Sequence, residues 1–174
     1  MGIIILVGLA RSGKDRVAEY IVENTGYTKY TFSDVLKEML EEKGMKATKQ
    51  NMIELGDMLR SQMGMDAVAR ILNKKINKTD NLVLVGPRSV EEIDFFKQKF
   101  PELKIIRVVA REEDRFTRRT EGNQTKEQFL ERDKKDIEKK GMQKVLDLAE
   151  LQINNFGTLE ELKKETESIL LMIQ

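Results

Sequence analysis

The chain of 174 residues contains no cysteine and no histidine. Without cysteine it has no disulfide framework, no thiolate nucleophile and no cysteine-based zinc site. Without histidine, no imidazole is present to act as the acid or base of a reaction. Any proton acceptor is therefore a carboxylate and any bound metal is held by oxygen atoms, which favours Mg²⁺ over zinc.

Long apolar runs and a charge excess are absent as well. The longest apolar run, Ile3–Val7, is too short to cross a bilayer, and no signal-peptide pattern is present. The net charge is +1, from 31 basic and 30 acidic residues, without the basic excess of a nucleic-acid-binding protein. We therefore expect a cytoplasmic protein with neither a nucleic-acid nor a membrane partner. A monomer and a homodimer both remain open.

Short β-branched runs alternate with helical patterns along the chain. The runs predict buried parallel strands at Ile3–Val7, Tyr27–Phe32, Leu82–Val85, Ile105–Val109 and Leu151–Ile153. Capping-box patterns predict helix starts at Ser89–Glu92, Thr125–Gln128 and Thr158–Glu161. The alternation predicts one α/β domain over residues 1–174, a three-layer α/β/α fold with a five-stranded parallel sheet.

Two long helical segments interrupt this alternation, at about 34–77 and about 111–141. We call them the first and the second insertion. Both are expected to stand over the carboxyl edge of the sheet, where open α/β sheets bind ligands.

A glycine-rich segment follows the first predicted strand. Gly8-Leu9-Ala10-Arg11-Ser12-Gly13-Lys14, here called the phosphate loop, matches G-x-x-x-x-G-K and opens a helical pattern. Its glycines let successive backbone N–H groups point inward, and the helix N-terminus adds partial positive charge. Lys14 is expected to reach the β- and γ-phosphates of a nucleotide. The predicted nucleotide-binding residues here are Gly8, Ala10, Arg11, Ser12, Gly13, Lys14, Asp15 and Arg16.

Two aspartates are candidate metal ligands. Asp15 stands where this motif usually has a Ser or Thr hydroxyl for Mg²⁺; it serves either the metal or only the electrostatics of the helix N-terminus. Asp34 follows the second predicted strand at the carboxyl edge. It either accepts the proton of an acceptor hydroxyl or holds Mg²⁺-bound water, or it is simply the N-cap of a helix at Val35–Glu42.

Several arginines are placed to bind phosphate. Arg88 follows the third predicted strand and suits bidentate phosphate binding. Arg60, in the first insertion, is either a clamp on the same acceptor phosphate or an exposed helix charge. In the second insertion Arg115 and Arg119 share a helix face at i,i+4 spacing and are expected to neutralise the transferring phosphoryl group. Arg132 is a further candidate on the acceptor side.

These segments together resemble the nucleoside-monophosphate-kinase superfamily, especially its dephospho-CoA-kinase-like and deoxynucleoside-monophosphate-kinase-like branches. The resemblance is carried by Gly8–Asp15, Phe32–Lys37, Glu54–Arg60, Gly86–Glu92, Arg115–Arg118, Phe129–Asp133 and Asn154–Leu162. It implies that the first insertion is an acceptor-binding lobe and the second a lid. It also implies ATP with Mg²⁺, a small phosphorylated acceptor, and adenine contacts from Asn155 and Gly157.

Three departures from that resemblance shape the functional hypothesis. Val85-Gly86 stands where relatives commonly carry Asp-Gly, the hydroxyl after Lys14 is missing, and the chain lacks the His-Pro pair of bacterial dephospho-CoA kinases. We expect an ATP-dependent phosphotransferase acting on a nucleoside or deoxynucleoside monophosphate. The alternatives are dephospho-CoA kinase activity and a nucleotide-binding regulatory module with weak catalysis.

Overall fold

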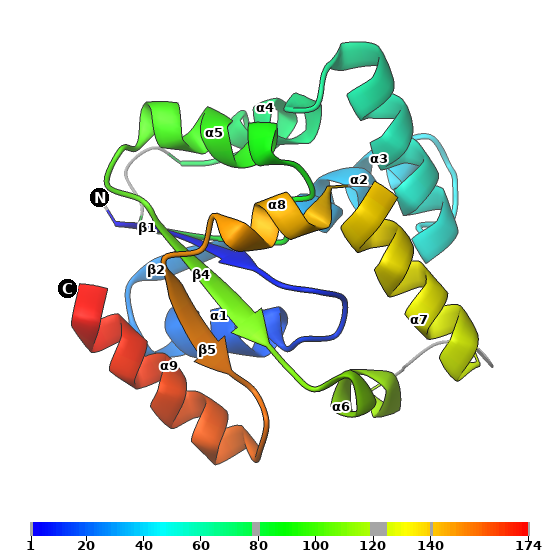
Figure 1. Ribbon diagram of the computed structural model, residues 1–174. Coiled ribbons are helices and arrows are strands. Elements are labelled where there is room, and N and C mark those ends of the chain that lie inside the picture. The colour runs from blue at the N-terminus through cyan, green and yellow to red at the C-terminus, as the bar shows by residue number, and fades with distance from the viewer. Residues whose placement is uncertain (1, 78–80, 119–124, 140, 174) are drawn as a thin grey trace.

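A computed structural model describes residues 2–77, 81–118, 125–139 and 141–173 (Figure 1). Five parallel strands form one sheet in the order β2-β3-β1-β4-β5. Their bounds are β1 (Ile3–Val7), β2 (Tyr27–Thr31), β3 (Asn81–Val85), β4 (Lys104–Val109) and β5 (Leu151–Asn154). All five predicted strands are therefore confirmed, each to within one residue at either end. The phosphate loop leaves the central strand, so it lies between the two halves of the sheet.

Helices cover both faces of the sheet, which confirms the predicted three-layer fold. They are α1 (Lys14–Asn24), α2 (Phe32–Glu42), α3 (Lys49–Met63), α4 (Ala67–Asn73), α5 (Val90–Lys99), α6 (Glu112–Thr117), α7 (Lys126–Lys134), the π-helix η1 (Lys135–Lys139), α8 (Met142–Asp147) and α9 (Leu159–Ile173). Side chains that alternate along β1 separate the core into two clusters. Ile4 and Leu6 pack with α1 and α9, whereas Ile3 and Ile5 pack with α2, α4, α5 and α8.

Local capping fixes the helix starts. Thr125 and Gln128 form the predicted capping box of α7, and Thr158 and Glu161 exchange the same two hydrogen bonds at the start of α9. The start of α2 differs from the sequence interpretation. The helix begins at Phe32, and Thr31 Oγ1 accepts the bond from the Asp34 amide, so Asp34 lies in the first turn and is not the N-cap.

Parts of both insertions lie over the carboxyl edge of the sheet, beside the phosphate loop. The first contains α2, α3 and α4, and the second contains α6, α7 and η1. Figure 1 shows α3, α6 and α7 beyond the ends of β1 and β4. In contrast, α2 and α4 pack on the face of the sheet with α5 and α8. Among the residues that the structure describes, no helix is long and apolar enough to span a membrane.

The α9 helix offers a matched test of this packing, because Leu170 is 8% exposed in the core and its neighbour Leu171 is 70% exposed. Leu170→Ala should lower the free energy of unfolding by about 2–5 kcal/mol, since it removes buried methyl groups and leaves a cavity. Leu171→Ala should change it by no more than about 0.5 kcal/mol. Urea denaturation followed by circular dichroism measures both values, and equal losses would contradict the assigned packing of α9.

Candidate functional site

The phosphate loop joins β1 to α1 through backbone conformations that its sequence makes accessible. Gly13 has φ of +103° and stands at the N-cap of α1. A Cβ atom at Gly13 would collide with Nδ2 of Asn155, so both the conformation and the space require glycine. The Ser12 amide donates to the Leu9 carbonyl (3.2 Å) and tightens the turn. The strand, loop and helix thus stand in the order that the motif requires.

Lys14 closes over this loop. Its Nζ donates to the carbonyl oxygens of Gly8 and Leu9, at 2.9 Å each. The pKa of Lys14 is lowered to about 7, chiefly by desolvation and in part by the charges of Arg88 and Arg115, while Asp15 opposes the shift. The ammonium therefore lies in a partly desolvated, positively charged environment, which a phosphate oxygen would neutralise.

Asn155 and Arg118 fix the other side of the loop. Asn155 follows β5, is buried, and donates from Nδ2 to the Ser12 carbonyl (2.9 Å). Arg118 donates to Asn155 Oδ1 (3.4 Å) and to the Arg11 carbonyl (3.5 Å). The predicted adenine contact Asn155 thus supports the phosphate loop directly, whereas Gly157, two residues later, is exposed.

The aromatic ring of Phe129 anchors the second insertion on the loop. Phe129 is fully buried, and the guanidinium groups of Arg11 and Arg115 lie over its ring at 5.3 and 5.2 Å from the centroid. Arg115 also donates to the Ala10 carbonyl (3.2 Å) and pairs with Asp133 (2.5 Å). Arg115 therefore contacts the phosphate loop. Its role at the transferring phosphoryl group stays a prediction, and Arg119 falls outside the described residues.

A cavity of about 590 Å³ opens beside Lys14, between the phosphate loop, the end of β3 and both insertions. It brings together predicted site residues from distant parts of the chain, namely Gly8, Lys14, Asp15, Arg60, Arg88 and Arg132. Apolar side chains of Phe32, Leu36, Met52, Ile53, Met65 and Met142 form much of its remaining wall.

The predicted acidic residue Asp34 is exposed in the first turn of α2 and does not line this cavity, although its neighbour Ser33 does. Two other carboxylates, Asp57 and Asp136, line it instead, and sequence reasoning missed both. Asp57 precedes Arg60 by one helical turn in α3, a spacing that could have indicated a shared face. Asp136 lies in η1, a π-helix without a sequence signature, although π-helical turns are frequent at functional sites.

The three cavity arginines have different partners. Arg60 donates from Nε (3.0 Å) and Nη2 (2.7 Å) to the fully buried Glu92, so the alternative of an exposed helix charge is wrong. Burial raises the pKa of Glu92, and Arg60 opposes that shift. Arg88 pairs with Asp136 at 3.3 Å. Burial lowers the pKa of the half-buried Arg132, which lies near Arg88, Arg11 and Asp136.

The candidate metal ligand Asp15 pairs with Lys29 of β2 at 2.9 Å and remains largely exposed. Arg16 pairs with Glu19 on the surface (3.0 Å). The described ranges contain no group of three or more acidic side chains placed to hold a metal ion. A metal here would depend on oxygen atoms of a bound phosphate chain, the arrangement that Mg²⁺ adopts in many phosphoryl-transfer sites.

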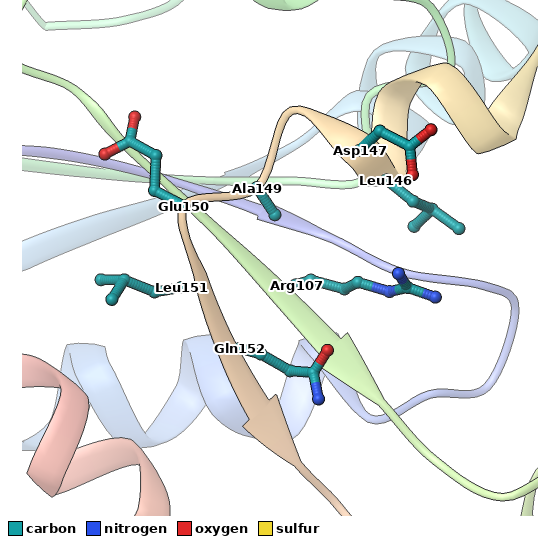
Figure 2. Close-up of a pocket in the computed structure, with 7 residues that line it drawn as sticks. All are labelled: Arg107, Leu146, Asp147, Ala149, Glu150, Leu151 and Gln152. Carbon is teal, nitrogen blue, oxygen red and sulfur yellow. The ribbon is translucent and has the colours of Figure 1, made fainter.

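A second hollow of about 220 Å³ lies between the end of α8, the middle of β4 and the start of β5 (Figure 2). Arg107, Asp147, Glu150 and Gln152 contribute its polar side chains. None of the predicted site residues lines it, so the cavity beside Lys14 is the candidate site.

Comparison with known proteins agrees with this geometry. A family model described as an AAA domain matches residues 7–140. A UPF0200 protein of Thermococcus gammatolerans is 32% identical, covering 97% of this chain and 93% of the relative. A UPF0200 protein of Aeropyrum pernix is 34% identical over 94% of this chain and 89% of the relative.

Solved structures share the fold at low sequence identity. Shikimate kinase from Aquifex aeolicus has a TM-score of 0.60 and 16% identity, covering 97% of this chain and 94% of that one. A gluconokinase from Sinorhizobium meliloti has a TM-score of 0.63 and 17% identity, covering 99% and 93%. The fold is therefore that of the small P-loop kinases.

The lowered pKa of Lys14 predicts pH-dependent anion binding. Sulfate is a suitable probe, because its own charge is constant near neutral pH. Below about pH 7 Lys14 is charged and sulfate affinity should be maximal; above it, the affinity should fall by up to about tenfold per pH unit, since the neutral amine must first take up a proton. Isothermal titration calorimetry from pH 6 to about 9 measures this. Lys14→Arg should remove the pH dependence of sulfate affinity, because arginine stays protonated. A wild-type sulfate affinity that does not change with pH would contradict the lowered pKa of Lys14.

Proposed function

The chain belongs to the AAA-domain family that its residues 7–140 match and to the UPF0200 proteins, and from this premise we propose that it transfers the γ-phosphoryl group of ATP to a small phosphorylated acceptor. The acceptor we propose is a nucleoside or deoxynucleoside monophosphate. One observation carries the proposal: a cavity large enough for such a ligand opens directly beside Lys14 and is bordered by Arg60, Arg88 and Arg132.

The two sides of the cavity suit the two parts of a nucleotide. The phosphate of the acceptor would meet Arg88 and Arg132 close to the phosphate loop, where guanidinium groups bind phosphate oxygens in bidentate fashion. The methionines Met52, Met65 and Met142, with Phe32, offer an adaptable apolar surface to the flat face of a base. Arg60 is held by Glu92, so it presents a fixed rather than a mobile charge.

The reaction forms a bond between an acceptor oxygen and the γ-phosphorus and breaks the bond to the oxygen bridging the β- and γ-phosphates, which leaves as part of ADP. Lys14, Arg88 and Arg115 would neutralise charge on the transferring group. Closure of the second insertion over both ligands would exclude water, so that ATP is not hydrolysed. Arg119, if it shares this role, would act from the same insertion.

The choice of acceptor decides what the carboxylates must do. A monophosphate acceptor attacks through an oxygen that is already ionised at neutral pH, so Asp34 or Asp57 need not accept a proton. Dephospho-CoA, the alternative acceptor, attacks through a hydroxyl and requires such a base. Mg²⁺ bound to the ATP phosphates, with Asp15 and Asp34 as the proposed protein ligands, would supply further positive charge.

A regulatory nucleotide-binding module is the second candidate, and a specific observation favours it. The described part of the chain offers no cluster of three acidic ligands, and the Asp15 carboxylate is already paired with Lys29. Such a module would bind ATP with or without Mg²⁺ and would produce no ADP with any acceptor.

The proposed activity is tested by ADP formation from ATP and Mg²⁺ with a panel of nucleoside and deoxynucleoside monophosphates and dephospho-CoA, with products identified by mass. One acceptor should yield a phosphorylated product, and Lys14→Met should lower the rate by about a hundredfold or more, because the charge nearest the phosphates is lost. Lys164→Met, at an exposed lysine of α9, is the control. A panel without product, despite ATP binding, would favour the regulatory module.

The proposed metal ligands are tested separately. Asp15→Asn and Asp34→Asn should each raise the Mg²⁺ concentration for half-maximal ATP affinity by about tenfold, since a neutral amide is a poorer ligand for Mg²⁺ than a carboxylate. Fluorescence titration with an ATP analogue at several Mg²⁺ concentrations measures this without turnover. Asp94→Asn, an exposed aspartate of α5, should change nothing. If both variants match it, neither aspartate serves the metal.

A further inference from the structure

Asp133 stands out among the acidic residues of α7 because it is buried against an arginine. Its side chain is 9% exposed and its Oδ2 lies 2.5 Å from Nη2 of Arg115, whose side chain is 6% exposed. Glu131, two residues earlier on the same helix, has a side chain that is 70% exposed. Its Oε1 lies 3.7 Å from Nζ of Lys135, so it forms a longer ion pair on the surface. The Asp133–Arg115 pair therefore joins α7 to α6 in the protein interior.

A buried ion pair is a poor means of stabilising a fold, since desolvation of both charges offsets most of their attraction. Apolar side chains would hold the two helices together at least as well. The neighbouring ring of Phe129, which contacts Arg115 and packs edge-on against Phe116 at 5.7 Å, already supplies such packing. Retaining both charges here therefore needs another explanation, and the direction of the arginine provides one.

The guanidinium of Arg115 points to the phosphate loop. Nη1 donates to the Ala10 carbonyl at 3.2 Å, while Nη2 faces Asp133. Further N–H groups of the guanidinium are left for an anion, because arginine carries more donors than these two contacts use. Lys14 contacts the carbonyls of Gly8 and Leu9, and Arg115 contacts that of the next residue, Ala10, so both cations lie against the same loop.

We propose that Asp133 is a positioning residue: its carboxylate holds the Arg115 guanidinium against the Ala10 carbonyl, so that the γ-phosphate of ATP meets an arginine already oriented toward the phosphate loop. This inference rests on the proposed function, because it takes ATP as the ligand of that loop. A preordered guanidinium loses less conformational freedom on binding than a mobile one and stabilises transferring charge without rearrangement. Asp133 itself touches neither ligand.

Chemical rescue tests this role apart from turnover. Arg115→Ala leaves a space beside Asp133 that methylguanidinium can fill. The affinity of Arg115→Ala for ATP should fall by about tenfold, and millimolar methylguanidinium chloride should restore most of it. In the double variant Arg115→Ala with Asp133→Asn, methylguanidinium should restore nothing, since no carboxylate holds it. Ammonium chloride at equal ionic strength is the control for salt, and Glu131→Gln combined with Arg115→Ala is the matched control for the acid.

The double variant removes both charges and thus avoids an unpaired buried ion, so it should remain folded even if Asp133→Asn alone does not. Circular dichroism verifies the fold of each variant.

Equal rescue with and without Asp133, no rescue of Arg115→Ala, or unchanged ATP affinity in Arg115→Ala would each overturn the proposal. Its failure is distinguishable from failure of the proposed function, because rescue is measured by ATP binding. A chain that shows rescue but forms no ADP with any acceptor would overturn the kinase assignment alone.

Discussion

Four cationic side chains converge beside the phosphate loop, and each of the four lies opposite an oxygen atom of the protein. Lys14 contacts the carbonyls of Gly8 and Leu9, and the arginines pair with carboxylates in Arg60–Glu92, Arg88–Asp136 and Arg115–Asp133. In a partly desolvated space such charges would otherwise repel each other strongly. The paired residues come from α3, α5, α6, α7, η1 and the segment that follows β3, so both insertions contribute to this balance of charge. It also means that an entering phosphate competes with oxygen atoms already in place.

Much of the framework could be predicted from the sequence because it depends on local patterns. β-Branched runs fix the strands, and hydroxyl residues followed by Glu or Gln fix the helix starts at Thr125 and Thr158. The phosphate loop is equally local, since Gly8, Gly13 and Lys14 belong to one short motif between a strand and a helix. The alternative that placed an N-cap at Asp34 is wrong by three residues, because the hydroxyl of Thr31 caps the helix.

The partners of the charged residues could not be predicted in the same way. Each arginine of the site has several acidic residues within reach in the sequence, and only the packed fold selects Glu92, Asp136 or Asp133. The π-helical turn that directs Asp136 into the cavity follows α7 without any break in the helical pattern. Asn155, which is expected to contact adenine, also donates to the loop at Ser12, because the end of β5 lies next to that residue.

The bond from Asn155 to the Ser12 carbonyl joins residues 143 positions apart. On the ribosome the amino-terminal strand emerges first, yet its loop lacks this support until the last strand of the sheet has been synthesised and paired with β4. Contacts of such long sequence separation form late, since a long stretch of chain must be ordered before they close. Nucleotide binding would therefore stabilise the finished chain and not its growing precursor, and a polypeptide interrupted before Leu151 would emerge from synthesis without the completed binding loop.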